Sequence, residues 1–294
     1  MKKYKYLLLL LTVCFFTSIV FAQTETKKVE SKKSKKVKNT FGSAWLMDNQ
    51  TVMVPIKGTF EMDIQHRFGT VNKGSEDVFG LFAPSNIRLG LSYAPVNNLY
   101  VGVGLTKDRM QVDLNAKYSL LQQTVDNKTP ISLTYFGNMV IDARKSINFR
   151  LPAHRFSYFN QLILARKISE KISIQVAPSF TWYNNVEAYI DKNGAIQDKM
   201  NNAHFAISTL GRFKITANSS IILGYDQPLT QHFTNNPKPN ISFGFETNTS
   251  AHSFQVFMGN YYGIIPQSNN VFNQNDFREG QFVIGFNITR LWNF

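Results

Sequence analysis

The chain has 294 residues, a formal net charge of +13 and one cysteine, Cys14. Aromatic residues make up 14% of it, and 25 of them are Phe. Because Cys14 lies in an N-terminal segment that export would remove, the mature chain is predicted to have no disulfide, no cysteine-based metal site and no thiol nucleophile. After that segment, no stretch approaches the roughly 18 consecutive apolar residues of a spanning helix.

Residues 1–22 have the parts of a secretory signal peptide. A lysine-rich start is followed by an apolar run over residues 7–21, and Val20-Phe21-Ala22 has the residue sizes of a cleavage site. The alternative is an uncleaved membrane anchor, but a spanning helix needs about 20 apolar residues. The pattern therefore favours export and cleavage after Ala22.

Residues 23–50 are predicted to form a disordered, Lys-rich tail. Most of the excess charge is at this end, since residues 1–40 contain ten Lys and two Glu. A basic tail can bind nucleic acid, but an exported chain meets none. A simple tether, or attraction to anionic lipid headgroups or polymers, fits the predicted location better.

From Lys57 onward, polar and apolar residues alternate, which is typical of strands with one wet and one apolar face. In residues 59–68 the apolar face is Phe60, Met62, Ile64 and Phe68, and the polar face is Thr59, Glu61, Asp63, Gln65 and Arg67. Residues 111–120 repeat the pattern, with Asp113 and Lys117 on the polar face. The polar faces of these strands are too charged to fill a conventional core.

The alternation predicts an all-β fold, an antiparallel transmembrane β-barrel of twelve strands over residues 51–294. The expected strands are 58–68, 86–94, 98–106, 110–121, 131–142, 155–167, 171–183, 203–215, 219–226, 239–247, 251–259 and 279–294. Bacterial single-chain barrels have even strand numbers. Ten or fourteen strands remain possible, if residues 219–226 merge with a neighbour or residues 51–56 pair.

A soluble sandwich or a lipocalin-like barrel would also alternate. Two features favour the membrane. The apolar faces carry aromatic and long aliphatic residues in strand after strand, and the connections alternate between short and long, as periplasmic turns and outer loops do. Only the connection at 107–109 is short where a long one is expected. Both termini are then expected to face the periplasm.

The C-terminus resembles the sorting signal of outer-membrane barrels. Trp292 and Phe294 continue the apolar phase of the last strand, which Arg290 interrupts. We expect these two residues to serve as an insertion signal for the barrel-assembly machinery, and outer-membrane lipid to contact the apolar faces.

Several segments together resemble a Bacteroidetes family of outer-membrane β-barrels to which no function is assigned. They include Gly58-Thr59-Phe60-Glu61, His66-Arg67-Phe68-Gly69, Ser85-Asn86-Ile87-Arg88-Leu89-Gly90 and Ala177-Pro178-Ser179-Phe180. The resemblance covers residues 51–294. It implies a location in the outer membrane and a barrel fold, and it implies no activity.

The residues indicate no enzyme and no cofactor. No two of the five histidines have a metal-ligand spacing. Glu61 and Asp63 could flank a glycosidic bond, but pairing with lumen cations is the stronger interpretation. The charged residues expected in the lumen are Glu61, Asp63, Arg67, Arg88, Asp113 and Lys117. Paired charges would close the barrel, whereas unpaired ones would select ions.

Three functions are compatible with this pattern. The first is a pore or transporter for small solutes with a polar, mixed-charge lumen. The second is a plugged structural or partner-binding barrel that acts through its outer loops. The third is a membrane-embedded hydrolase, for which the sequence offers no nucleophile motif such as Gly-x-Ser-x-Gly.

Overall fold

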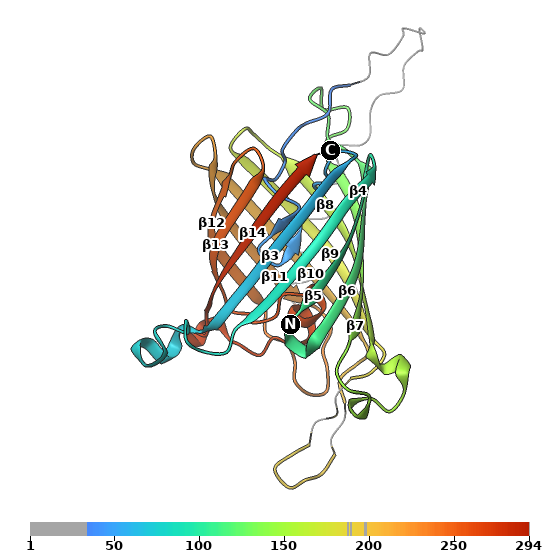
Figure 1. The fold of residues 1–294 in the computed structure, drawn as a ribbon, viewed down its shortest axis with the longest axis vertical. Helices are drawn as coiled ribbons and strands as arrows, with labels where there is room; N and C mark the ends of the chain where they lie inside the picture. The colour runs from blue at the N-terminus through green and yellow to red at the C-terminus, as the bar shows by residue number, and fades with distance from the viewer. Residues whose placement is uncertain (1–33, 187, 189, 197–198, 294) are drawn as a thin grey trace, which may run out of the picture. The chain divides into compact units, whose positions relative to one another are not determined.

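The computed structural model describes residues 34–186, 188, 190–196 and 199–293. The predicted signal peptide and residues 23–33 of the predicted tail lie outside these residues. Twelve antiparallel strands form a closed barrel (Figure 1). They are β3 (Thr59–Thr70), β4 (Asn86–Val96), β5 (Leu99–Thr106), β6 (Gln111–Leu121), β7 (Ser132–Asp142), β8 (Phe156–Lys167), β9 (Ile172–Tyr183), β10 (Ala203–Lys214), β11 (Ser219–Pro228), β12 (Asn240–Asn248), β13 (His252–Gly259) and β14 (Val283–Asn293).

Each strand of the wall pairs with the next one in the chain, and β14 pairs with β3 to close the ring. No edge is left with unpaired backbone groups, which hydrocarbon would not tolerate. The predicted barrel of twelve strands is therefore confirmed. Residues 51–56 do not join the wall.

Alternation along each strand sorts the side chains between the two faces of the wall. On β3, residues Glu61, Asp63 and Arg67 are buried inside, while Phe60 and Ile64 lie outside. Five aromatic residues on the outer face are between 38 and 46% exposed: Tyr93, Tyr118, Tyr135, Tyr158 and Trp182. The outer face therefore offers apolar and aromatic surface to lipid. In the described part of the chain, no helix has the length and apolar character needed to cross a membrane.

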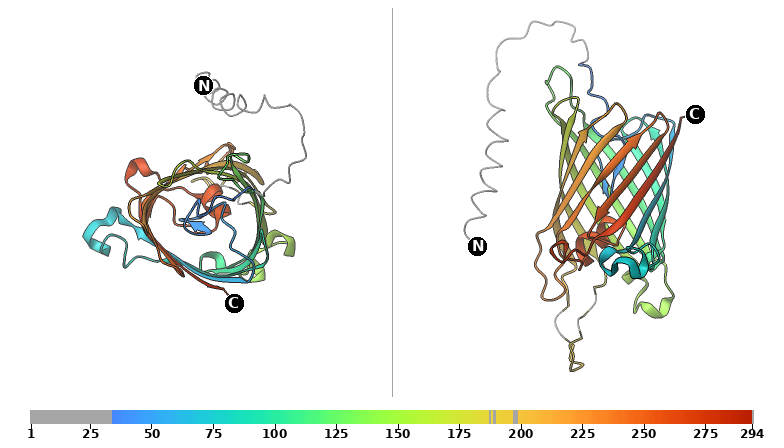
Figure 2. Two further views of the ribbon diagram at one scale, coloured as in Figure 1. Left: turned by 90° about the horizontal axis from the view of Figure 1, so that it is seen from above. Right: turned by 90° about the vertical axis from the view of Figure 1, so that its left-hand side faces the viewer.

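Short and long connections lie at opposite ends of the barrel (Figures 1 and 2). The short ones are residues 97–98, 122–131, 168–171, 215–218 and 249–251. The long ones, 71–85, 143–155, 184–202, 229–239 and 260–282, contain the 3-10 helices η1 (Val71–Asp77), η3 (Ser146–Asn148), η4 (Pro152–Arg155) and η5 (Phe277–Glu279). The connection 107–110, with η2 (Asp108–Met110), is the short exception at the long-loop end.

The lumen is occupied, which corrects one prediction. Residues 40–50 were expected in the disordered tail, but residues 40–52, here named the lumen hairpin, lie inside the barrel (Figure 2). Strands β1 (Trp45–Leu46) and β2 (Asn49–Gln50) pair there. Burial of Phe41, Leu46 and Met47 offsets the conformational entropy of ordering this segment.

A second segment enters the barrel from the opposite end. It is helix α2 (Pro266–Phe272), part of the long connection between β13 and β14, and its residues Gln267, Asn269 and Val271 are buried. Figure 2 shows this helix and the lumen hairpin within the ring of strands. The sequence predicted an ordinary outer loop over residues 260–278, and the structure corrects this by placing a helix there.

Candidate functional site

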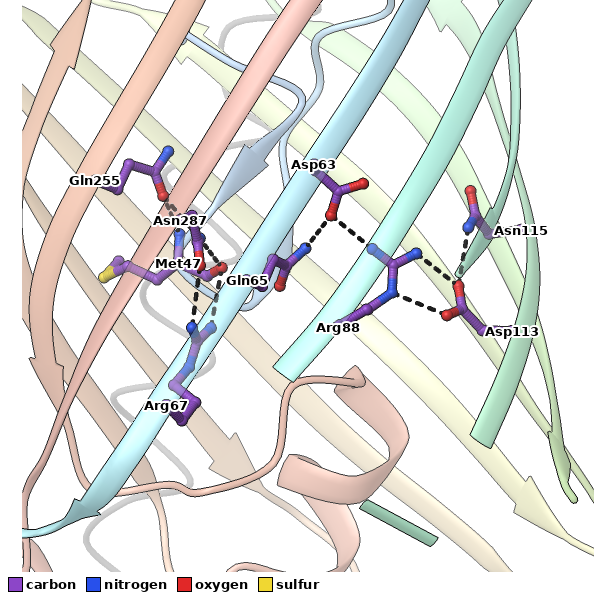
Figure 3. Close-up of polar contacts among 9 residues, drawn as sticks. All are labelled: Met47, Asp63, Gln65, Arg67, Arg88, Asp113, Asn115, Gln255 and Asn287. Atoms are coloured by element: carbon purple, nitrogen blue, oxygen red, sulfur yellow. Dashed lines mark hydrogen bonds and ion pairs between the residues drawn. The ribbon is translucent and has the colours of Figure 1, made fainter. Parts of the chain in front are cut away.

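The best-defined charged cluster on the inner wall joins strands β3, β4 and β6, with β5 between the last two. Arg88 on β4 donates from Nη1 to Asp63 Oδ1 on β3 at 2.7 Å, and from Nε and Nη2 to the two oxygens of Asp113 on β6, each at 2.9 Å (Figure 3). Gln65 and Asn115 donate to the same two carboxylates. A buried carboxylate is stable only when a cation and hydrogen-bond donors satisfy it. The structure thus brings together three of the expected lumen residues.

Two glycines make room for this cluster. Gly90 and Gly104 face the lumen between the three charged residues, and each pairs across the sheet with a residue of the cluster or with the other glycine. A Cβ atom at Gly90 would overlap the carboxylate of Asp63, and one at Gly104 would overlap Asp113 and the guanidinium of Arg88. Glycine is required at both positions because the ion pairs fill the space that a side chain would occupy.

Arg88 also contacts the lumen hairpin, since its guanidinium lies over the ring of Trp45 at 5.1 Å. The two other expected lumen cations, Arg67 and Lys117, also contact the lumen hairpin. Arg67 on β3 donates to the carbonyl of Met47 at 3.4 Å and to Asn287 Oδ1 at 3.0 Å. All three wall cations therefore hold the hairpin as well as the wall.

Lys117 on β6 makes the most direct of these contacts. Its Nζ donates to Gln50 Oε1 at 2.6 Å, to the Thr51 carbonyl at 3.2 Å and to the Ala44 carbonyl at 3.4 Å. Glu61 lies on the inner face of β3 and is 1% exposed, and within the described residues it makes no ion pair. The sequence placed these side chains in the lumen, but it did not predict that the chain itself would be the partner of Lys117.

Two glutamines clamp the hairpin on other parts of the wall. Gln255 on β13 accepts from the Met47 amide at 2.9 Å (Figure 3). It also donates to the Trp45 carbonyl at 2.8 Å. Gln175 on β9 accepts from the Val52 amide at 3.0 Å and donates to the Gln50 carbonyl at 2.8 Å. Asn287 on β14 adds a 2.6 Å hydrogen bond to the Met47 carbonyl. The backbone of the hairpin is thus satisfied by side chains of the wall.

An apolar seal completes the contact between the hairpin and the wall. Phe41, Leu46, Met47 and Val52 pack with inward-facing apolar side chains of the strands. These wall residues are Phe136, Phe159, Ile163, Leu210, Ile222 and Phe257. These six side chains interrupt the polar face of their strands. Such an interruption in the sequence indicates that the lumen contains an apolar core.

The hairpin and helix α2 meet in the middle of the lumen. Asn269 Nδ2 donates to Asp48 Oδ2 at 2.8 Å. Beside it, Asn49 Nδ2 donates to Asp226 on β11 at 3.1 Å and to Asp48 at 3.4 Å. On the other side of the helix, Asn138 on β7 donates to Gln267 Oε1 at 3.3 Å. The two inserted segments and the wall form one continuous polar network.

The remaining expected site residues lie on the outside of the barrel or beyond the described part. Trp292 packs on Phe60 of β3, with centroids 5.7 Å apart. Phe294 lies outside the described residues. Among the residues that the structure describes, no three His, Cys, Asp or Glu side chains come together in a way that could hold a metal ion.

The chain matches a known protein family over most of its length. Residues 41–292 match a family described as a membrane-bound β-barrel domain (DUF5777). The chain belongs to this family. The DUF5777 match begins at Phe41, so it includes the lumen hairpin together with the wall. No protein with a curated description matches the chain.

Solved structures share the fold of this DUF5777 chain. An outer-membrane channel from Pseudomonas putida F1 is 12% identical, covers 82% of this chain and 97% of its own, and has a TM-score of 0.50. The NanC porin is 8% identical and covers 80% and 99%, with a TM-score of 0.49, and the KdgM porin is 11% identical and covers 78% and 98%, with a TM-score of 0.46. The DUF5777 chain is an outer-membrane β-barrel protein, as its sequence predicted.

Proposed function

We propose that the protein is an outer-membrane channel for small solutes and that the lumen hairpin closes it in the present conformation. The observation that carries the proposal is how the hairpin is held. Gln175, Gln255, Asn287 and Lys117 bind its backbone and side chains through hydrogen bonds, which water can replace. Each neutral bond of this kind contributes only about 0.5–1.5 kcal/mol net, and a bond of the charged Lys117 contributes about 1.5–3 kcal/mol. A segment held this way can be displaced without unfolding the wall.

A plugged barrel that acts through its outer loops is the second candidate. The apolar seal favours it, because withdrawing the hairpin would expose Phe41, Leu46 and Met47. Exposing a large apolar side chain costs roughly 1.5–3 kcal/mol. A closed state is therefore strongly preferred unless something stabilises the displaced hairpin. No catalytic step belongs to either candidate.

Single-channel recording separates the two candidates. The purified mature chain in planar bilayers is expected to show rare openings. In the double variant Gln175→Leu, Gln255→Leu, the hairpin loses both glutamine clamps, and we expect the open probability to rise at least tenfold. Gln161→Leu is the matched control, since Gln161 is buried on the inner face of β8 and makes no hydrogen bond to the hairpin in the described structure. Silence of all three proteins at every voltage would leave the plugged barrel as the function.

The route into the membrane is a separate part of the proposal. We infer that Trp292 and Phe294 are read by the barrel-assembly machinery and that lipid then surrounds the outer face. Support comes from the apolar phase of the last strand, on which Ile284, Phe286 and Ile288 also point outward. Deletion of Phe294 is expected to lower the amount of heat-modifiable barrel in outer-membrane fractions severalfold. The control Leu121→Ala, at the exposed last residue of β6, should leave that amount unchanged.

A further inference from the structure

The shortest connection at the long-loop end of the barrel borders a cavity. The chain passes from β5 to β6 through residues 107–110 alone, whereas the other connections at this end are longer. Between this turn and helix α2 lies a cavity of about 290 Å³, which we name the α2 cavity. Its lining includes Asp108 of the turn, Tyr262 and Gly263 before the helix, Asn269 of the helix and Asn275 after it.

The α2 cavity contains a buried oxygen that accepts no hydrogen bond. Asn269 is 1% exposed, and its Nδ2 donates to Asp48 Oδ2 at 2.8 Å, which fixes the orientation of the amide. Within the described residues, Asn269 Oδ1 is buried and has no partner. Gly263 lies directly beside this oxygen, because a Cβ atom at Gly263 would overlap it. A buried acceptor without a partner costs free energy, so a donor that enters the cavity is favoured at this place.

Two further polar side chains line the α2 cavity without partners. The backbone amide of Asp108 donates to Asn86 at 3.1 Å, but its carboxylate makes no hydrogen bond or ion pair in the part of the chain that the structure describes. The side-chain amide of Asn275 makes no hydrogen bond there either. The half-buried Tyr262 adds an aromatic ring. These residues give the cavity several hydrogen-bonding groups and one apolar surface.

The charges at the α2 cavity balance. Among the described residues that line it, Asp108 is the one carboxylate and Arg109 the one guanidinium. The guanidinium of Arg109 lies 5.0 Å over the ring of Phe272 and has a further interaction, so it is not free to bind a ligand. Because the two formal charges cancel, neither an anion nor a cation is attracted by a net charge. The cavity is therefore suited to an uncharged ligand.

From these observations we propose that the α2 cavity binds a small uncharged polyol of the size of one sugar ring. A hydroxyl group both donates and accepts, so it can satisfy the carboxylate of Asp108, the Oδ1 of Asn269 and the amide of Asn275. The C–H face of a sugar ring can pack on the ring of Tyr262. Ligand pockets usually have about 300–1,000 Å³, so a cavity at the lower end of this range holds one small molecule.

This inference rests on the proposed channel, for which it names the class of solute received at the long-loop end. A solute bound to Asn269 Oδ1 contacts the same amide whose Nδ2 binds Asp48 of the lumen hairpin. The cavity is thus one side chain away from the segment that closes the barrel. Binding can be measured without transport. Conductance without binding would reject the cavity alone, and binding without conductance would reject the channel alone.

The test is a saturation-transfer NMR titration of the purified mature protein in lauryldimethylamine oxide, a detergent without a sugar headgroup. Glucose, galactose and xylose are the neutral polyol probes, and cyclohexanol is a ring of similar size with a single hydroxyl. We expect saturable binding of at least one of the three sugars, and affinity for cyclohexanol at least tenfold weaker, because one hydroxyl cannot satisfy the three polar groups.

Two variants remove the polar groups singly. Asp108→Asn keeps the size of the side chain but replaces a charged acceptor by a neutral one, which forms weaker hydrogen bonds, so the affinity for the sugar should fall fivefold or more. Asn275→Ala removes the free amide and should lower the affinity at least threefold. Heat-modifiable migration on gels is expected to be unchanged in both variants, since neither side chain holds the wall together.

Glu76→Gln is the matched control. Glu76 is an exposed carboxylate of η1 at the same end of the barrel and does not line the cavity. This variant should bind the sugar like the wild type. The proposal is overturned if none of the three sugars binds saturably, if cyclohexanol binds as tightly as the sugars, or if Asp108→Asn binds no more weakly than Glu76→Gln.

Discussion

Asn269 and Asp48 join the two segments that enter the barrel from opposite ends, through a 2.8 Å hydrogen bond from Nδ2 of the amide to Oδ2 of the carboxylate. Both side chains are almost fully buried. The bond links helix α2 to the lumen hairpin, 221 positions away in the sequence. Loosening either segment should therefore affect the other.

This contact gives the first prediction. Asn269→Asp places a second carboxylate against Asp48 without changing the size of the side chain. Two buried like charges repel, so we expect a loss of several kcal/mol in the free energy of unfolding at neutral pH. Acidification should recover part of that loss, because protonating one carboxylate removes the repulsion. Urea unfolding in lipid vesicles at pH 7.5 and pH 5 measures both effects.

Asn269→Leu serves as its control. Leu lacks the donor but adds no charge, so a smaller loss of about 1–3 kcal/mol is expected at pH 7.5 from the lost hydrogen bond to Asp48. Equal losses of unfolding free energy for the Asp and Leu variants at neutral pH would show that charge repulsion with Asp48 does not contribute.

The second prediction concerns the ion pairs of Arg88. Arg88→Met leaves Asp63 and Asp113 buried without their cation, and breaking a buried pair in this way costs about 3–5 kcal/mol. The triple variant Arg88→Met, Asp63→Asn, Asp113→Asn removes the stranded charges and should be clearly more stable than the single one. A triple variant no more stable than Arg88→Met would contradict the assignment of the three residues to one cluster. Unfolding by urea provides the comparison.

The third prediction tests the space around that cluster. Gly104→Ala would push a methyl group into Asp113 and Arg88, and overpacking of this kind typically costs about 1–3 kcal/mol. Gly211→Ala is the matched control on β10, where the nearest side-chain atom to an added Cβ is 3.9 Å away. We expect the control to be neutral or slightly stabilising. Unfolding midpoints of the two variants should differ accordingly, and equal midpoints would argue against tight packing at Gly104.

The fourth prediction concerns pH at the long-loop end. His232, in the connection 229–239, accepts a 3.0 Å hydrogen bond from the Asn201 amide at Nδ1, and its Nε2 lies 3.0 Å from Nδ1 of His204. Burial lowers the pKa of His232 below its ordinary value. The unfolded chain, with a pKa of about 6.5, then takes up the proton first. Local stability is thus full above that pH and falls as the pH drops below it.

Hydrogen exchange of the Asn201 amide between pH 7.5 and pH 5 measures this change, after correction for the intrinsic pH dependence of exchange. Protection should decrease on acidification, since a protonated His232 can no longer accept the bond. His232→Asn keeps an acceptor near the position of Nδ1 and does not titrate, so its protection should be nearly independent of pH. Protection in the wild type that stays constant over this range would be incompatible with Nδ1 of His232 accepting this hydrogen bond.

The strands of the barrel wall could be predicted from the sequence, but the two segments inside the lumen could not. Glu61, Asp63 and Arg67 fall on one face of a strand whatever the neighbours are, because alternation is a local property of the backbone. The partners of these charges depend on how adjacent strands are staggered. Arg88 reaches Asp113 across the intervening strand β5, where Gly104 leaves space. That relationship becomes visible only in three dimensions.

The lumen hairpin was missed for a related reason. Its two strands have two residues each, which is too short to show an alternating pattern of polar and apolar residues. The lysines that precede them also resemble a solvated tail. The informative signal lay elsewhere, in Phe136, Phe159 and Phe257, which interrupt the polar face of their strands. An aromatic side chain on the wet face of a barrel strand requires an apolar partner inside the lumen.

The position of the lumen hairpin in the chain has a consequence for biogenesis. The ring closes only when β14, the last strand of the wall, pairs with β3, the first strand of the wall. The segment that fills the centre precedes β3 in the chain, so it is joined to the first strand of the wall and is available while the wall is still an open sheet. A circularly permuted chain that began at β3 and ended with the hairpin would have to thread that segment through a finished ring. The order of segments in the native chain lets the wall form around the lumen hairpin.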